Sequence, residues 1–256
     1  LPGDESEGVA RSGARVGCAV PGAMGFVLPA GVLAAYAAIH FDMAANAEVL
    51  RYAGNSIMLS ALAAVLAVLI GIFMAYGVRL RNERVLQIMA RIASMGYAIP
   101  GSVLAVGVLV SLGALDNGID AFARARFGVS TGLLLSGTIA AVTFGYLVRF
   151  LALSFGTVEA SLNKITPSMD GAARSLGHSP FSTLRQIHIP LIRGSVLTAC
   201  MMVFVDCMKE LPMTVVLRPF NFHTLATFVH QYASDEQLGE ASLAAHVGNG
   251  SAPLHS

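Results

Sequence analysis

Long apolar stretches separated by short polar segments dominate this chain. A helix that crosses a hydrocarbon core of about 30 Å needs about 20 residues at about 1.5 Å per residue. The stretch 55–78 contains no charged residue and is followed by Arg79, Arg81 and Arg84. The pattern predicts about five membrane-spanning helices, at 16–39, 55–78, 88–115, 133–153 and 194–217.

The third stretch contains the sequence GYAIPGS at 96–102, which predicts an irregular helix. Pro100 has no N–H and removes one backbone hydrogen bond, so we expect a kink there. Gly96 and Gly101 remove side-chain volume. Such a segment is either a hinge at Pro100 or a site where two helices pack closely, and the sequence leaves both interpretations open.

The segment 157–193 contains the longest internal part of the chain that is too polar for lipid, and it predicts two short helices that meet at a corner. Thr166 is expected to cap the first helix, with Pro167 at its first position. Gly177 should end this helix, because glycine adopts the left-handed conformation without steric cost. An apolar stripe at i, i+3, i+4 and i+7 consists of Met169, Ala172, Ala173 and Leu176.

Ser179 and Pro180 repeat the capping pattern and predict a second helix, which Pro190 should end. Considered alone, two helices joined at a corner are compatible with a hairpin packed in a protein core. They are also compatible with a DNA-reading helix-turn-helix.

Composition assigns the chain to the membrane proteins. Of its 256 residues, 55% are hydrophobic and 12% are charged, compared with about 25% charged residues in soluble domains. The mean hydropathy is +0.68. A net charge of +1 argues against a nucleic-acid-binding protein, whose domain is normally strongly basic.

Basic residues are distributed unevenly between the two sides of the predicted membrane. With the corner on the cytoplasmic side, most of them fall in cytoplasmic segments, as the positive-inside rule requires. We therefore expect the corner to face the cytoplasm. The inside set is Arg11, Arg15, Arg79, Arg81, Arg84, Arg91, Arg149, Lys164, Arg174, Arg185 and Arg193, and the outside set is Arg51, Arg124, Arg126 and Arg218.

The sequence contains no pattern that predicts a catalytic site. A G-x-x-x-x-G-K-[ST] phosphate-binding loop is absent, and the two lysines, Lys164 and Lys209, lie in other contexts. The patterns H-E-x-x-H and C-x-x-C are absent as well. We expect no enzymatic activity, no cofactor and no resident metal ion in this chain.

The corner resembles the EAA loop of permease subunits of binding-protein-dependent ABC importers. That motif reads Glu-Ala-Ala, three residues, Gly, nine residues, Ile, one residue, Leu-Pro. Two positions depart from it, because Gly171 replaces the Glu, with Asp170 one place earlier, and Ile189 replaces the Leu. The positions that fit the spacing are Ala172, Ala173, Gly177, Ile187 and Pro190.

The similarity to ferric-iron permeases runs from about 26 to 245 and includes the segment 206–236. In those permeases one long chain carries two homologous membrane halves, and this sequence resembles the second half. The resemblance implies an all-α, MetI-like polytopic bundle in a bacterial inner membrane. It also implies three partners: a periplasmic substrate-binding protein, a second permease half, and a cytoplasmic subunit that binds and hydrolyses ATP.

The resemblance divides the chain into a polar N-terminal segment at 1–15, a transmembrane permease domain at 16–245 with the coupling loop 157–193, and an atypical polar tail at 246–256. The chain begins with Leu rather than Met, and the tail is too short and polar to form the last span that the family would have. We therefore expect a piece of a longer permease.

The helix pair 166–190 is expected to dock on the ATPase and to transmit its motion to the flanking spans. An amphipathic helix can place its apolar face in a groove of a partner. In the alternative interpretation this face packs on the protein's own helices. The expected coupling residues are Asp170, Ala172, Ala173, Leu176, Gly177, Ile187 and Pro190.

Asp206, Lys209 and Glu210 share one helical face near the end of the fifth predicted span. Each charge costs about 2.5–3.5 kcal/mol at the centre of a span, so Lys209 should pair with Asp206 or Glu210. The three residues form either a translocation pathway or gate, or an ion pair that locks helices together. Carboxylates also suit a hard trivalent cation.

Ferric iron is the expected cargo, while thiamine, a polyamine or a phosphonate would use the same machinery. A protein of another class, an ATP-independent channel or ion-coupled carrier, would use Asp206, Lys209 and Glu210 as its working site. The dependence of transport on ATP and a partner ATPase separates these classes.

Overall fold

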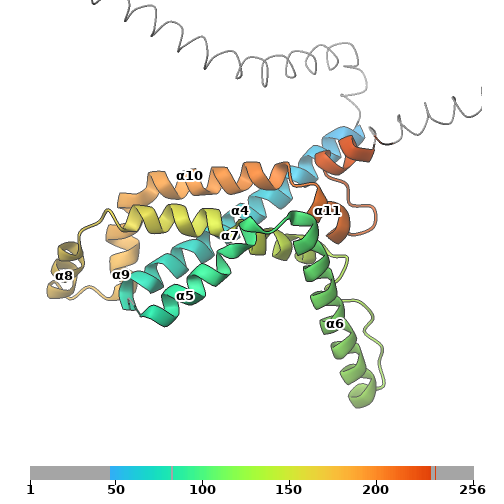
Figure 1. Cartoon of the computed structure of the whole chain (residues 1–256), viewed down its shortest axis with the longest axis horizontal. Coiled ribbons are helices and arrows are strands. Elements are labelled where there is room, and N and C mark those ends of the chain that lie inside the picture. Colours follow the sequence, from blue (N-terminus) through green and yellow to red (C-terminus); the bar gives the residue numbers. More distant parts are fainter. Residues whose placement is uncertain (1–46, 82, 232–233, 235–256) are drawn as a thin grey trace, which may run out of the picture. The chain divides into compact units, whose positions relative to one another are not determined.

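The computed structural model describes residues 47–81, 83–231 and 234, and every regular element in these ranges is helical (Figure 1). Four of the described helices are long and apolar enough to cross a membrane. This confirms the prediction of an all-α polytopic protein. The predicted span 16–39, the segment 1–15 and the tail 246–256 lie outside the described residues.

The chain divides into two compact units, 1–51 and 52–256, and the packing that builds the functional region lies within the second. The described elements are α4 (Ala47–Arg81), α5 (Arg84–Ala93), the 3-10 helix η2 (Met95–Ala98), α6 (Gly101–Phe127), α7 (Ile139–Leu162), α8 (Pro167–Ser175), α9 (Pro180–Thr183), the π-helical turn η3 (Leu184–His188), α10 (Ile189–Met208) and α11 (Pro212–Leu217).

Helix α7 lies at the centre of the packing, with α10 along one side of it (Figure 1). Small residues let α4 approach α7 closely. A Cβ atom at Gly71 would lie 2.9 Å from Ser154 Oγ, and that hydroxyl donates a 2.8 Å hydrogen bond to the Ala67 carbonyl. The core that results contains Leu59, Ala63, Ala67, Tyr146, Phe150, Val203, Met213 and Leu217.

The predicted third span at 88–115, with its expected kink at Pro100, is divided into separate helices. The chain forms α5, the short turn η2 and then α6, with Pro100 as the N-cap of α6. Pro100 cannot donate a hydrogen bond back into the preceding turn, so the backbone breaks there rather than bending.

Helix α6 also extends to Phe127, although the sequence from Asp116 onward is polar. Backbone N–H groups of the loop that follows donate hydrogen bonds to the two acidic side chains of this part of the helix. Asp116 is fully buried and accepts backbone N–H groups from Leu134, Leu135 and Ser136. Asp120 accepts the N–H groups of Thr131 and Gly132. The loop therefore folds back along the helix.

Pro190 does not end the second corner helix, which differs from the sequence prediction. The elements α9, η3 and α10 form one helical run from Pro180 to Met208. The wider turn η3, in which the Ile189 N–H bonds the Leu184 carbonyl, ends two residues before Pro190. A proline cannot donate the backbone hydrogen bond to residue i−4 that an α-helix needs. In the π turn the backbone hydrogen bonds reach residue i−5 instead, and the helix continues past Pro190. The fifth span therefore begins earlier than predicted, and α11 is separate from it.

Candidate functional site

The corner forms where the sequence places it. Pro167 occupies the first turn of α8 and Gly177 adopts φ +79°, the left-handed conformation that ends the helix. Ser179 caps the next helix by accepting the N–H of Ser182 at 3.2 Å. Thr166 lies at the N-cap position of α8, but its hydroxyl pairs with Ser168 at 3.0 Å instead of with the backbone.

The predicted apolar stripe of α8 divides between two faces. Ala173 is 2% exposed and packs toward the protein's own helices, so it does not lie on the docking face where the sequence placed it. Leu176 is 79% exposed and Met169 is 38% exposed, and Phe181 of α9 adds a further side chain that is 71% exposed. We call Met169, Leu176 and Phe181 the corner patch.

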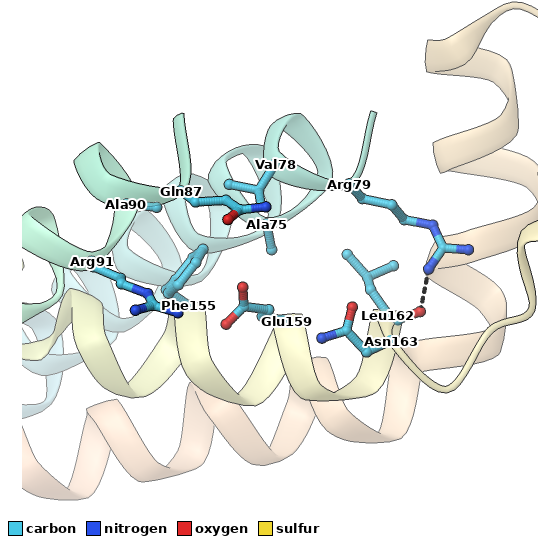
Figure 2. A pocket seen from close by; sticks show the side chains of 10 residues that line it. All are labelled: Ala75, Val78, Arg79, Gln87, Ala90, Arg91, Phe155, Glu159, Leu162 and Asn163. Carbon is cyan, nitrogen blue, oxygen red and sulfur yellow. Dashed lines mark hydrogen bonds between the residues drawn. The ribbon is translucent and has the colours of Figure 1, made fainter. Parts of the chain in front are cut away.

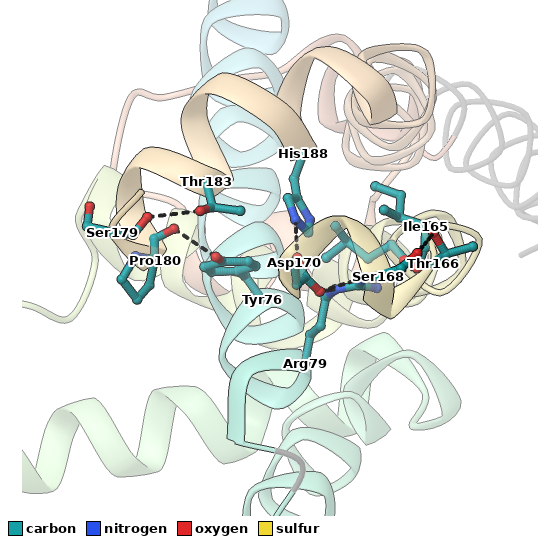
Figure 3. Close-up of polar contacts among 11 residues, drawn as sticks. Tyr76, Arg79, Ile165, Thr166, Ser168, Asp170, Ser179, Pro180, Thr183 and His188 are labelled. Carbon is teal, nitrogen blue, oxygen red and sulfur yellow. Dashed lines mark hydrogen bonds and ion pairs between the residues drawn. The ribbon is translucent and has the colours of Figure 1, made fainter. Parts of the chain in front are cut away.

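Asp170 points inward, next to Ala173, and is held by an arginine of α4 (Figure 3). Arg79 donates from Nε and Nη2 to Asp170 Oδ2 at 3.0 and 2.8 Å. The same guanidinium donates to the carbonyl of Ile165 at 2.9 Å and to that of Leu162, the last residue of α7. One side chain therefore joins the ends of α4 and α7 to α8.

The other oxygen of Asp170 accepts a hydrogen bond from His188 (Figure 3). His188 belongs to η3, is fully buried, and lies with Nε2 2.7 Å from Asp170 Oδ1. The ring of Tyr76 packs edge-on against His188 at 5.4 Å between centroids. The Tyr76 hydroxyl donates to the Pro180 carbonyl at 2.7 Å, which fixes the start of α9 to α4.

The partners Tyr76, Arg79 and His188 were not predicted from the sequence. Arg79 was assigned to the positive-inside set, and its partner Asp170 lies 91 positions further along the chain. The remaining predicted coupling residues lie nearby: Ile187 is half-buried in η3, Pro190 is exposed at the start of α10, and Ala172 is exposed on α8.

A polar cavity of about 350 Å³ lies beside this network, between α4, α5 and α7 (Figure 2). Arg79 and Leu162, which take part in the network, also line the cavity. Its other polar lining residues are Gln87, Arg91, Glu159 and Asn163. The end of α7 is therefore not fully enclosed by side chains of the described region.

A second charged cluster lies at the junction of η2, α7 and the turn after α10. Lys209 pairs with Asp206 at 2.7 Å, and this hydrogen bond raises the pKa of Lys209. Glu210 pairs instead with Arg149, with 3.2 Å between Oε2 and Nε. Arg149 is near the end of the predicted span 133–153, but it lies in the interior of α7, which continues to Leu162.

Arg149 and Glu210 also contact the irregular segment around Pro100. Arg149 Nη1 donates to the Ile99 carbonyl at 2.9 Å. A Cβ atom at Gly101 would lie 2.5 Å from Glu210 Oε1, and one at Gly96 would lie 1.9 Å from the Val148 carbonyl oxygen. These distances support the close-packing interpretation of the two glycines, while a hinge at Pro100 stays a prediction.

Comparison with known families identifies the family of this chain. The model of the family described as binding-protein-dependent transport system inner membrane component matches residues 67–218, which include α8, η3 and both charged clusters. The chain belongs to this family. Together with the four apolar helices, this makes the permease a multi-pass protein of the inner membrane.

Individual relatives agree with the family. The permease is 27% identical over 196 residues to the Fe(3+)-transport system permease protein FbpB 2 of Haemophilus influenzae. The aligned region is 76% of this chain and 35% of that protein. It is 25% identical over 196 residues to the ferric transport system permease protein FbpB of Actinobacillus pleuropneumoniae, covering 76% of this chain and 28% of that protein.

A third relative carries the name of a 2-aminoethylphosphonate transport system permease, PhnV of Salmonella typhimurium. It is 26% identical over 163 residues, covering 64% of this chain and 56% of that protein. The chain spans about a third of the length of the ferric relatives that it matches.

Proposed function

We propose that this permease forms part of the membrane pathway of an ATP-driven importer and receives the motion of a cytoplasmic ATPase at the corner formed by α8 and α9. A periplasmic binding protein delivers the cargo, and a second permease half completes the pathway. ATP binds to the partner subunit, and this chain needs no cofactor.

The exposed corner patch is the observation that carries this proposal. Leu176 at the end of α8 and Phe181 at the start of the helical run from Pro180 to Met208 have side chains that are 79% and 71% exposed. Basic residues flank the patch, including Arg174 and Arg185, and the positive-inside rule puts such a segment in the cytoplasm. An apolar helical surface with this exposure fits a groove on a soluble partner.

Ferric iron is the cargo that the relatives favour, because ferric permeases match the larger share of this chain. A phosphonate is the second candidate, supported by the relatives of the PhnV type. Uptake of iron or of 2-aminoethylphosphonate, delivered by the respective binding protein into proteoliposomes with the complete transporter, distinguishes the two cargoes.

The second charged cluster serves as a gate in this proposal, and Pro100 serves as its hinge. Arg149 and Glu210 connect α7 to the turn between α10 and α11, and Arg149 also bonds the carbonyl of Ile99 beside the hinge. Asp206 and Lys209 form the more exposed part of this cluster. Opening this junction would separate η2, α7 and the turn after α10 from one another.

Replacing Phe181 with aspartate should abolish the association of the permease with its ATPase. A carboxylate at this exposed position is solvated in the free permease but would be desolvated in an apolar groove, so binding should weaken by at least about 2 kcal/mol. The measurement is the amount of ATPase that remains with the affinity-purified, detergent-solubilised transporter.

Phe220→Asp is the matched control for this experiment. Phe220 is fully exposed on a turn close to His223. The His223 carbonyl accepts a hydrogen bond from Asn55, near the start of α4, whereas α8 is held by Arg79, near the end of α4. The control residue and the corner therefore lie toward opposite ends of α4. The control should retain the ATPase. If Phe181→Asp also retains it, docking at the corner is excluded, and transport without ATP would then favour a channel or ion-coupled carrier.

A further inference from the structure

Helix α8 is attached to the membrane helices mainly by polar contacts. Ala173 is the one residue of α8 that is buried, and the helix has only nine residues. A helix of this length is not stable in isolation, because nucleation costs more than so few hydrogen bonds return. Apart from the chain connections at its two ends, α8 can transmit force to the long helices only through the few side-chain contacts that fix it.

Arg79 provides the first of these points. Its guanidinium bonds one carboxylate oxygen of Asp170 through two nitrogens, and it bonds the carbonyls of Leu162 and Ile165 as well. The last carbonyls of a helix such as α7 have no partners within the helix and carry partial negative charge. The planar guanidinium therefore holds α8 and the end of α7 at a fixed separation from α4.

Asp170 provides the second point, because its other oxygen accepts from His188 at 2.7 Å. His188 is fully buried in the helical run that continues into α10. Two oxygens of a single carboxylate thus connect α8 to α4 on one side and to α10 on the other. Displacement of α8 necessarily strains the ends of α4, α7 and α10 together.

We propose that Arg79, acting through Asp170, transmits displacement of the corner into the membrane helices. The proposal rests on the proposed function, since the partner ATPase supplies the displacement. Arg79 is a positioning residue: its side chain is 13% exposed and lies outside the corner patch. A purely structural role would affect only assembly, whereas transmission affects the amount of cargo moved for each ATP hydrolysed.

The test compares Arg79→Lys with Arg81→Lys in the complete transporter reconstituted in proteoliposomes. Lysine keeps the charge of Arg79, but a single ammonium cannot reproduce the fork that bonds Asp170, Leu162 and Ile165 together. Arg81 is the matched control, because it lies two residues further along α4, its side chain is 75% exposed, and within the described part of the chain its ion pair is a 3.8 Å contact with Glu83.

Three quantities are measured: ATPase retained on purification, ATP hydrolysis stimulated by the iron-loaded binding protein, and ferric iron accumulated per ATP. Arg79→Lys should retain the ATPase and its hydrolysis, while iron accumulated per ATP falls about tenfold, a typical size for a coupling effect. Arg81→Lys should equal the unmodified transporter in all three.

An unchanged ratio of iron to ATP in Arg79→Lys overturns the proposal. If Arg79→Lys does not assemble, Asp170→Asn takes its place, since asparagine keeps the shape and an acceptor oxygen, and the same fall in the ratio is expected. Failure of both variants to assemble shows a structural role and also overturns it. Failure of the unmodified transporter to retain its ATPase would instead reject the proposed function, so the two failures are distinguishable.

Discussion

Replacing Gly96 with alanine is expected to prevent the permease from reaching its folded state. The added Cβ would lie 1.9 Å from the Val148 carbonyl oxygen and 2.8 Å from the Val148 carbonyl carbon, both atoms of the α7 backbone. Backbone cannot rotate away as a flexible side chain would, so η2 would have to separate from α7. The cost should exceed the ~1–3 kcal/mol that is typical of overpacked cores.

The measurement is the yield of monodisperse protein in detergent and its midpoint of thermal unfolding. Gly107→Ala is the matched control, because apart from its chain neighbours and the adjacent backbone of α6, no described atom lies within 4 Å of the Cβ that it would add. Alanine also favours a helix over glycine by up to about 1 kcal/mol, so the control should be unchanged or slightly stabilised. Equal yields and midpoints for the two variants would contradict the close packing of η2 on α7.

Glu210→Ala should destabilise the permease by about 3–5 kcal/mol, because it leaves the charge of Arg149 without its partner inside the helix bundle. The side chains of Glu210 and Arg149 are 8% and 19% exposed, so water replaces little of the lost interaction. The measurement is the free energy of unfolding in mixed micelles, obtained by titration with a denaturing detergent.

Two further variants separate this effect from a general sensitivity of the region. Asp206→Ala removes the partner of Lys209, whose side chain is 71% exposed, so its cost should stay below about 1 kcal/mol. The double variant Arg149→Met with Glu210→Leu should recover most of the stability, since apolar replacement of both members of a buried pair is often neutral. A double variant as unstable as Glu210→Ala would refute this account.

The helices and the corner could be predicted because their signals are local. A charge-free run of apolar residues, a serine before a proline, and a glycine directly after the last apolar position act on their immediate neighbours. This is why α8 and the start of α9 have the predicted bounds. The same reasoning failed at Pro190, since the π turn that accommodates the proline has no comparable local signature.

The charged network could not be predicted, because ion pairs between helices depend on how the helices are placed side by side. Lys209 was expected to pair with Asp206 or Glu210, its neighbours on one helical face, and it does pair with Asp206. Glu210, in contrast, pairs with Arg149 of α7, which no local pattern indicated. Asp170 illustrates the same limit. Its position on α8 was clear, yet nothing local indicated that Arg79 and His188 would hold both of its oxygens.

The π turn η3 also has a consequence for the lengths of related permeases. Each residue of an α-helix turns the chain by about 100°, so one added residue would normally rotate everything beyond it. A π turn absorbs one extra residue locally, and the flanking helices keep the faces that they present to their neighbours. Relatives that are one residue shorter between Thr183 and Ile189 can therefore keep the packing of α10 on α7, and sequence alignments of this loop should allow a single-residue gap there.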